Sequence, residues 1–328
     1  MKSLFKPFFV NEPYQDPGLL IKIFGRKEYF IIDLGDISKL TVKTILKISR
    51  VFITHTHIDH FFGFDGLLRT SLSKKEPIYI YGPRGIIKNV YGKILGYTWN
   101  LITEYPINIY VHEICKNHIT SCLFSAKNKF KKVILGKQKI NDCIIYEDEE
   151  ITIKAIELDH KIPVLAFLLK EKKRVNVRKD VLNEMKLKPG PWLSELKKII
   201  INNTPLDKTT IQVPDKGPIP ALDLTNKLLL IKDGESIAYI TDILYSKKNL
   251  TKIKDHFYEP DILFCEAFFT SEDVVRAKER YHLTARQTYE ISKLIKAKKL
   301  IIFHFSPRYK GKFHRIYKEV GLSFSNDE

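Results

Sequence analysis

Cysteine is scarce in this sequence. No two of its four cysteines form a Cys-x-x-Cys pair, which excludes a cysteine zinc ribbon and a dithiol redox site. Each lies in or near an apolar run, so we expect buried, reduced thiols, which are typical of a cytoplasmic protein. The four are Cys115, Cys122, Cys143 and Cys265.

Long apolar runs are missing too. No stretch reaches the roughly 18 uncharged apolar residues of a membrane span, and residues 1–7 lack the apolar run and cleavage site of a signal peptide. Internal repeats and low-complexity tracts are also absent. With 328 residues, 44% of them hydrophobic, we expect a globular, non-membrane chain that buries its own core as one large domain.

Acidic residues are few relative to basic ones. Asp and Glu number 38 against 55 Lys and Arg, which gives a net charge of +17 and a pI near 9.4. Such a balance favours a polyanionic partner such as nucleic acid or an anionic membrane surface. The chain is also rich in Lys, Ile, Asn, Tyr and Phe, all with AT-rich codons, so genome composition is an equally good explanation of the excess lysine.

Short apolar runs alternate with amphipathic stretches, a pattern typical of an α/β chain. Residues 228–232 and 236–241 should pair as a hairpin around Asp233 and Gly234. Helices are expected at 38–49, 61–72 and 284–297. Strands are expected at 19–24, 29–34, 51–54, 78–81, 151–158, 261–265 and 300–303, with further strands between 107 and 167.

Residues 170–216 differ from the rest of the chain. They are dense in Lys and Arg, show no strand-like core pattern, and contain the sequence Lys-Pro-Gly-Pro-Trp at 188–192. We interpret this segment as an arm inserted into a single domain that spans residues 1–328. A solvated insertion without function is the alternative.

The segment 54–60 reads Thr-His-Thr-His-Ile-Asp-His and follows an apolar strand. His55 and His57 are two residues apart, so at an extended strand end they can point the same way. Asp59 and His60 follow at the turn into a helix and can face a second metal ion. Imidazole and carboxylate ligands suit zinc, with manganese or iron less favoured. A solvated histidine cluster is the alternative, but four metal-competent side chains within six residues argue against it.

Three further candidate ligands stand where an apolar strand meets a loop. His160 follows the strand at 151–158, Asp242 follows the strand at 236–241, and His304 follows the strand at 300–303. Strand ends are the usual place for a site in an α/β sheet. The chain is therefore predicted to hold a catalytic metal centre.

The motifs that carry this chemistry resemble a known family. Residues 55–60, His-Thr-His-Ile-Asp-His, are similar to the signature of the metallo-β-lactamase superfamily. Cys-Glu-Ala at 265–267, Tyr-His-Leu-Thr-Ala at 281–285 and His-Phe-Ser-Pro-Arg-Tyr at 304–309 resemble the late motifs of ribonuclease Z, which matures tRNA 3′ ends. The resemblance implies an αββα four-layer sandwich, a precursor tRNA substrate and a homodimer.

The resemblance also implies a role for each residue. Two zinc ions per chain are expected, with manganese or another divalent metal possible. His55, His57 and His160 would hold one ion, Asp59, His60 and His304 the other, and Asp242 would bridge them. Asp59 would also accept a proton from the attacking water. His282, oriented by Glu266, would protonate the leaving 3′ oxygen.

Substrate contacts are expected at two places. Thr284, Ser306 and Arg308 are candidates for holding phosphate oxygens, with ordinary loop hydrogen bonds as the alternative. The Gly-Pro sequence of the arm falls where ribonuclease Z carries a tRNA-gripping arm, and basic residues there would meet phosphates. The arm candidates are Arg174, Arg178, Lys188, Gly190 and Pro191.

Some family features are altered. The opening Gly-Thr loop is absent, residues 32–37 read Ile-Asp-Leu-Gly-Asp-Ile, and residues 239–243 read Tyr-Ile-Thr-Asp-Ile. The expected function is a zinc-dependent phosphodiesterase that cleaves 3′ trailers from precursor tRNA. Two alternatives are a hydrolase of small phosphodiesters or other esters on the same fold, and a non-catalytic nucleic-acid-binding protein on this scaffold.

Overall fold

The computed structural model describes residues 3–201 and 204–322. The chain divides into two compact units. Unit 1 comprises residues 1–146, 153–169 and 236–328, and unit 2 comprises residues 147–152 and 170–235. None of the described helices is both long and apolar enough to cross a bilayer.

Unit 1 contains two packed sheets. The first has the order β1-β2-β3-β4-β5-β6-β7-β8 and is parallel from β3 to β6. Its strands are β1 (Phe5–Phe9), β2 (Leu19–Ile23), β3 (Tyr29–Ile32), β4 (Ile48–Phe52), β5 (Ile78–Pro83), β6 (Asn108–Cys115), β7 (His118–Ser125) and β8 (Val133–Lys139).

The second sheet has the order β18-β17-β16-β11-β10-β9, and β16, β17 and β18 run parallel. Aromatic side chains fill the space between the sheets: the rings of Phe52 and Phe167 lie 5.6 Å apart, and those of Phe9 and Phe264 lie 5.4 Å apart. The strands are β9 (Ile144–Glu147), β10 (Ile151–Asp159), β11 (Pro163–Glu171), β16 (Ser236–Ile240), β17 (Ile262–Glu266) and β18 (Lys299–Phe303).

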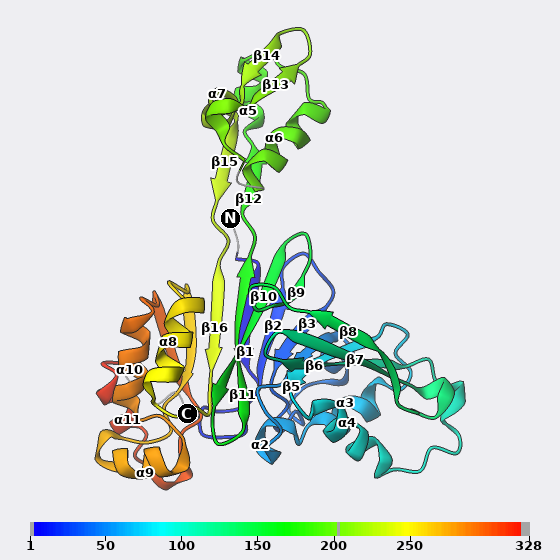
Figure 1. Ribbon diagram of the computed structural model, residues 1–328, viewed down its shortest axis with the longest axis vertical. Coiled ribbons are helices and arrows are strands. Elements are labelled where there is room, and N and C mark those ends of the chain that lie inside the picture. The colour runs from blue at the N-terminus through cyan, green and yellow to red at the C-terminus, as the bar shows by residue number, and fades with distance from the viewer. Residues whose placement is uncertain (1–2, 202–203, 323–328) are drawn as a thin grey trace. The chain divides into compact units, whose positions relative to one another are not determined.

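Helices cover the outer faces of both sheets (Figure 1). Leu67 of α3 and Val90 of α4 pack into one core with Val51 of β4, and Ile253 of α8 and Ile291 of α10 pack into another. The result is the predicted αββα four-layer sandwich. The helices of unit 1 are α1 (Val42–Ile45), α2 (Ile58–Phe61), α3 (Phe64–Ser71), α4 (Ile86–Leu95), α8 (Lys247–His256), α9 (Val274–Arg280), α10 (Ala285–Leu294) and α11 (His314–Glu319).

Unit 2 has its own small core. Trp192 and Leu196 are buried there with Val175, Ile211 and Leu224. The insertion therefore continues to Glu235, beyond the expected boundary at Lys216, because the later residues complete this core. Its elements are β12 (Arg174–Val177), α5 (Lys179–Glu184), α6 (Pro191–Ile201), β13 (Thr210–Val213), β14 (Gly217–Pro220), α7 (Ala221–Leu228) and β15 (Leu229–Lys232).

The predicted hairpin of residues 228–232 and 236–241 is wrong. β15 pairs with β12 inside unit 2, whereas β16 pairs in parallel with β17 inside unit 1. Asp233 and Gly234 join the two units instead of forming a tight turn. A side chain at Gly234 would collide with the carbonyl of Glu171, so the position requires glycine for close approach rather than for a hairpin.

Two predicted helices are shorter than expected. Residues 38–49 contain only the single turn of α1, because β4 begins at Ile48. Residues 61–72 are divided between α2 and α3 at Gly63. A side chain at Gly63 would collide with the carbonyl of Gly35, and the Gly63 amide donates to the carbonyl of Leu34 at 2.8 Å. The break thus fixes the histidine-rich turn against the loop that follows β3.

Candidate metal centre and active site

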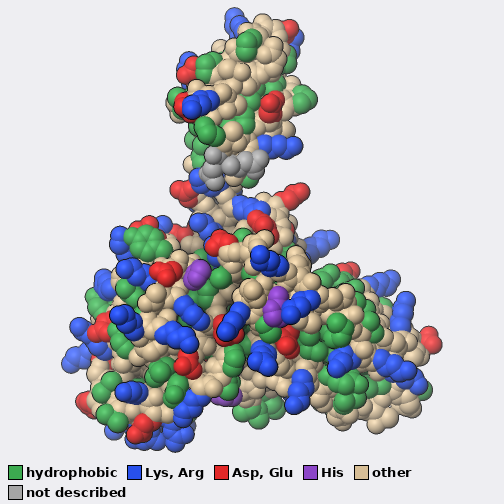
Figure 2. Space-filling model, in the orientation of Figure 1, with side chains coloured by type: hydrophobic (Ala, Val, Ile, Leu, Met, Phe, Trp, Pro, Cys, Tyr) green, Lys and Arg blue, Asp and Glu red, His purple; other side chains and the backbone are tan. Residues whose placement is uncertain are grey.

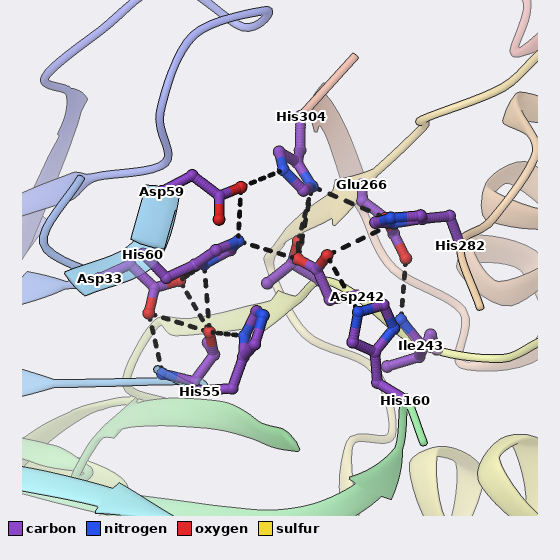
Figure 3. Close-up of polar contacts among 12 residues, drawn as sticks. Asp33, His55, Asp59, His60, His160, Asp242, Ile243, Glu266, His282 and His304 are labelled. Atoms are coloured by element: carbon purple, nitrogen blue, oxygen red, sulfur yellow. Dashed lines mark hydrogen bonds and ion pairs between the residues drawn. The ribbon is translucent and has the colours of Figure 1, made fainter. Parts of the chain in front are cut away.

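The predicted metal ligands converge where strands of both sheets end (Figure 3). Side-chain ligand atoms lie within 4.8 Å of one another in overlapping groups, which together contain all seven predicted ligands. The groups are His55, His57 and His160; His55, His60 and Asp242; Asp59, His60 and His304; and Asp242, Glu266, His282 and His304.

Backbone conformation helps to aim these side chains. Asp33, Asp242 and His304 each follow a strand directly or by one residue, and each has a positive φ, between 54° and 59°. Asp and His tolerate this left-handed region better than bulkier residues, but it still carries a strain cost of about 1–2 kcal/mol each. Three such residues at one site indicate that the surrounding packing holds the geometry against that cost.

Two buried nitrogens show that the cluster fits metal ions. The Nε2 atoms of His55 and His60 are inaccessible to solvent and have no hydrogen-bond partner. His60 Nε2 lies 3.1 Å from Asp242 Oδ2 but outside hydrogen-bond geometry. A buried unsatisfied polar atom costs about 1–3 kcal/mol. Divalent cations held by His55, His60 and Asp242 would satisfy both nitrogens.

The opposite ring nitrogens are fixed by hydrogen bonds. His160 Nδ1 donates to the carbonyl of Tyr281 at 2.7 Å, and His60 Nδ1 donates to Asp33 Oδ2 at 2.9 Å. These bonds place a proton on Nδ1, and a bound metal ion would take the place of any proton on Nε2. Such outer contacts set the tautomer and the ring orientation of metal-binding histidines.

Asp33 was missed by the sequence prediction. Its carboxylate is fully buried and accepts from the Thr54 amide at 2.8 Å, from the Thr54 hydroxyl at 2.9 Å, from His60, and from the Tyr239 hydroxyl at 3.2 Å. An acidic residue directly after the apolar strand β3 was the available signal. It has the same setting as Asp242, at the end of an apolar strand.

Burial and charge set the ionisation of the cluster before any metal binds. Burial holds the pKa of His55 well below its usual value, so this imidazole is neutral, as metal binding would require. Burial also disfavours the charged form of His304, yet the charge of Asp242 and the hydrogen bonds to Asp59 and Glu266 together outweigh it and raise the His304 pKa to about 10. The attraction between these groups shows that a cation at this position is electrostatically favoured.

His282 and Glu266 form a pair at the edge of the cluster. His282 Nδ1 donates to Glu266 Oε2 at 2.8 Å, and Glu266 Oε1 accepts from the amide of Ile243 at 2.9 Å. The His282 ring stacks on Phe268 with centroids 4.0 Å apart. Although burial raises it, the charge of His282 and the hydrogen bonds from His282 and His304 together hold the pKa of Glu266 below its usual value. The pair is therefore oriented by both hydrogen bonding and packing.

Comparison with known proteins establishes the family. Residues 23–78 match the model of the metallo-beta-lactamase superfamily. Ribonuclease Z of Pyrococcus horikoshii is 31% identical over 315 residues, which cover 94% of this chain and 85% of that protein. The chain belongs to the ribonuclease Z family. It is accordingly a metal-dependent hydrolase.

Other members of the ribonuclease Z family agree over most of their length. Human zinc phosphodiesterase ELAC protein 1 is 29% identical over 318 residues, covering 86% of this chain and 80% of that protein. The solved structure of human tRNase Z, short form, has a TM-score of 0.53 at 20% identity and covers 93% of this chain and 92% of that one. The latter likeness supports the fold.

The three residues that are candidates for holding phosphate make other contacts in the structure. The Thr284 hydroxyl accepts from the amide of Gln287 and caps α10. Arg308 forms an ion pair with Asp273 at 2.6 Å. Ser306 is buried and precedes a short 3₁₀ turn. The structure does not bring these residues into the ligand cluster, and their role in holding phosphate stays a prediction.

The arm candidates lie in unit 2. Arg174 pairs with Glu171, Arg178 lies 3.6 Å from Asp180, and Lys188 lies 3.2 Å from Asp215. Gly190 and Pro191 lead into α6, and the Trp192 indole donates to the carbonyl of Lys188 at 3.0 Å. The Gly-Pro segment thus stands at the start of α6, where the buried Trp192 hydrogen-bonds back to Lys188.

Unit 2 is less basic than its first part suggests. Residues 170–216 contain twelve Lys and Arg against six Asp and Glu, but the whole unit contains fourteen against thirteen. Unit 1 contains forty-one against twenty-five. Most of the net positive charge therefore belongs to unit 1, and Figure 2 shows Lys and Arg spread widely over the visible face of the sandwich.

Proposed function

We propose that this chain is a zinc-dependent endoribonuclease that removes 3′ trailers from precursor tRNA. The observation that carries the proposal is the His282–Glu266 pair, set 2.8 Å apart beside a cluster of metal ligands. A metal centre alone is compatible with many hydrolytic reactions. A buried carboxylate that orients an imidazole adds a general acid, which is needed when the leaving group is poor, such as a ribose 3′ oxygen.

We infer that two zinc ions bind per chain. His55, His57 and His160 would hold one ion and Asp59, His60 and His304 the other, with Asp242 shared. Two such ions activate a water and neutralise the charge of an in-line phosphoryl transition state. The identity and number of the ions are part of the proposal.

Asp59 would accept the proton of the attacking water. Burial raises the Asp59 pKa, but the hydrogen bond from His304 and the charge of His60 outweigh it and hold the pKa below its usual value. Asp59 is therefore ionised at neutral pH. Its side chain is 38% exposed, so substrate and water can reach it.

His282 would donate the proton that the leaving oxygen needs. As the phosphorus–O3′ bond breaks, its electron pair stays on O3′ and takes the proton from His282 Nε2. His282 Nδ1 remains bonded to Glu266, whose negative charge stabilises the protonated ring before transfer. Water is consumed, and the products are a 3′ hydroxyl on the tRNA and a 5′ phosphate on the trailer.

Recognition of precursor tRNA would use unit 2. Phosphate contacts supply affinity for any nucleic acid, and unit 2 is a compact module with a core of its own. Because its basic side chains alternate with acidic ones, we expect the unit to position the RNA at a few phosphates rather than to bind through bulk charge. A homodimer is part of this proposal.

Hydrolysis of a small phosphodiester is the second candidate. The nearly balanced charge of unit 2 favours it, since fourteen basic residues against thirteen acidic ones give little attraction for a polyanion. The family includes proteins named zinc phosphodiesterase. Both activities would use the same ligands and the same general acid.

Cleavage-site mapping on a 3′-extended tRNA separates the candidates. We expect one cut at the junction of tRNA and trailer, which leaves a 3′ hydroxyl, with kcat/KM far above that for bis(p-nitrophenyl) phosphate. Scattered cuts, or no cut while the small diester is hydrolysed, would refute the tRNA assignment.

A further inference from the structure

A cavity of about 190 Å³ opens beside the proposed general acid. His282 forms part of its wall. The cavity lies entirely within unit 1, between the loop that follows β16 and the helices α9 and α10. Neither the metal ligands nor the phosphate candidates lie in its wall.

One part of the cavity wall is apolar, and it is exposed. Val274 is 46% exposed and Val275 is 70% exposed, although they stand next to the reaction centre. Leu244 adds a third apolar side chain. Exposed apolar surface beside an active site is a sign of a ligand that covers it. A flat ligand with apolar faces would do so.

Polar groups lie on the remaining wall. Gln287 is held in place because its Oε1 accepts from the amide of Thr284 at 3.0 Å, and its amide nitrogen brings donors to the lining. The Tyr245 hydroxyl donates to Glu290 at 2.7 Å, which fixes the ring. Lys278 brings a positive charge. These groups suit the polar edge of a nucleobase and a nearby phosphate.

We propose that this cavity binds the base of the nucleotide whose 3′ oxygen leaves. This binding role rests on the proposed function, because it takes His282 as the group that protonates that oxygen. The ribose that bears O3′ must then lie against His282, and its base is attached to the same ribose. The cavity that His282 lines is within reach of that base, and Lys278 would contact the phosphate on its 5′ side.

The apolar wall can be removed without disturbing the helix that carries it. Val274 and Val275 are the first two residues of α9, where asparagine is tolerated because the first turn lacks intrahelical acceptors for its amides. The double variant Val274→Asn/Val275→Asn removes two of the three apolar side chains from the wall without adding charge near His282. Val42→Asn is the matched control, since Val42 is the first residue of α1 and is 62% exposed.

The test combines this variant with a change in the substrate. Each enzyme is assayed on a 3′-extended tRNA and on the same RNA made abasic at the nucleotide 5′ of the cut. We expect the double variant to lose about tenfold in kcat/KM on the normal RNA but under twofold on the abasic one, since coupled contacts are not additive. Val42→Asn should match the wild type on both.

Two results would overturn the inference. If the losses from the variant and from base removal multiply, the cavity does not hold that base, and the proposed function still stands. A wild type that cuts no precursor RNA at a defined position would overturn the proposed function and this inference together.

Discussion

Unit 1 and unit 2 organise charged side chains in opposite ways. In unit 1, the titratable groups around the ligand cluster are buried at strand ends and held by hydrogen bonds from several elements, as Asp33 and Glu266 are. In unit 2, they are mostly exposed ion pairs around a small apolar core, as with Lys188 and Asp215. Exposed pairs contribute little to stability. The difference indicates that chemistry resides in unit 1 and that unit 2 is separable from it.

The largest effect is expected from the shared ligand of unit 1. Asp242→Ala should lose both metal ions, because a carboxylate shared by two ions supports both, and activity on every substrate should fall to background. Metal content measured by ICP-MS on the purified variant, with Asp215→Ala in unit 2 as control, checks this. Retention of two ions per chain by Asp242→Ala would show that the ligand set is wrong.

His282→Ala should have the next largest effect. Loss of a general acid typically costs about 10²–10⁴ in rate, while the metal content should stay unchanged. A substrate with a good leaving group, such as p-nitrophenolate, should lose far less because it needs no proton.

The control for this variant is metal analysis. Asp242, Glu266, His282 and His304 could together hold a cation, so His282 is a possible ligand as well. If His282→Ala loses a metal ion, the imidazole is a ligand and not the acid.

Asp33→Asn should have an intermediate effect. The variant keeps the size of the side chain but weakens acceptance from His60 Nδ1, which fixes the His60 tautomer. Loss of such an outer hydrogen bond typically lowers metal affinity about 10- to 100-fold. Competition with a chelating dye measures this affinity, and Asp36→Asn, a nearby carboxylate that accepts from Ser38, is the control. Equal affinity in both variants would remove Asp33 from the site.

The sequence predicted unit 1 better than unit 2. The convergence of the candidate ligands in unit 1 could be predicted because a metal centre needs particular side chains at strand ends, and His55, Asp242 and His304 have that setting in the sequence. Asp33 has the same setting but acts through His60, and such a contact between distant segments has no local pattern. In unit 2 the core of Trp192 and Leu224 assembles only when β12 pairs with β15, so neither its end at Glu235 nor its balanced charge was apparent from residues 170–216.

The most direct test of the separation is excision of unit 2. The Glu171 amide donates to the Glu235 carbonyl at 2.9 Å, so the chain ends of an excised arm are adjacent. Replacing residues 173–233 by a short Gly-Ser turn should leave metal content intact and hydrolysis of bis(p-nitrophenyl) phosphate within about twofold. Binding of precursor tRNA should weaken, and it should depend less on salt. The slope of log K against log salt concentration should become shallower by about 0.9 for each phosphate that unit 2 neutralises, by analogy with duplex DNA. Equal losses on both substrates, with metal retained, would contradict the account, as would unchanged tRNA binding.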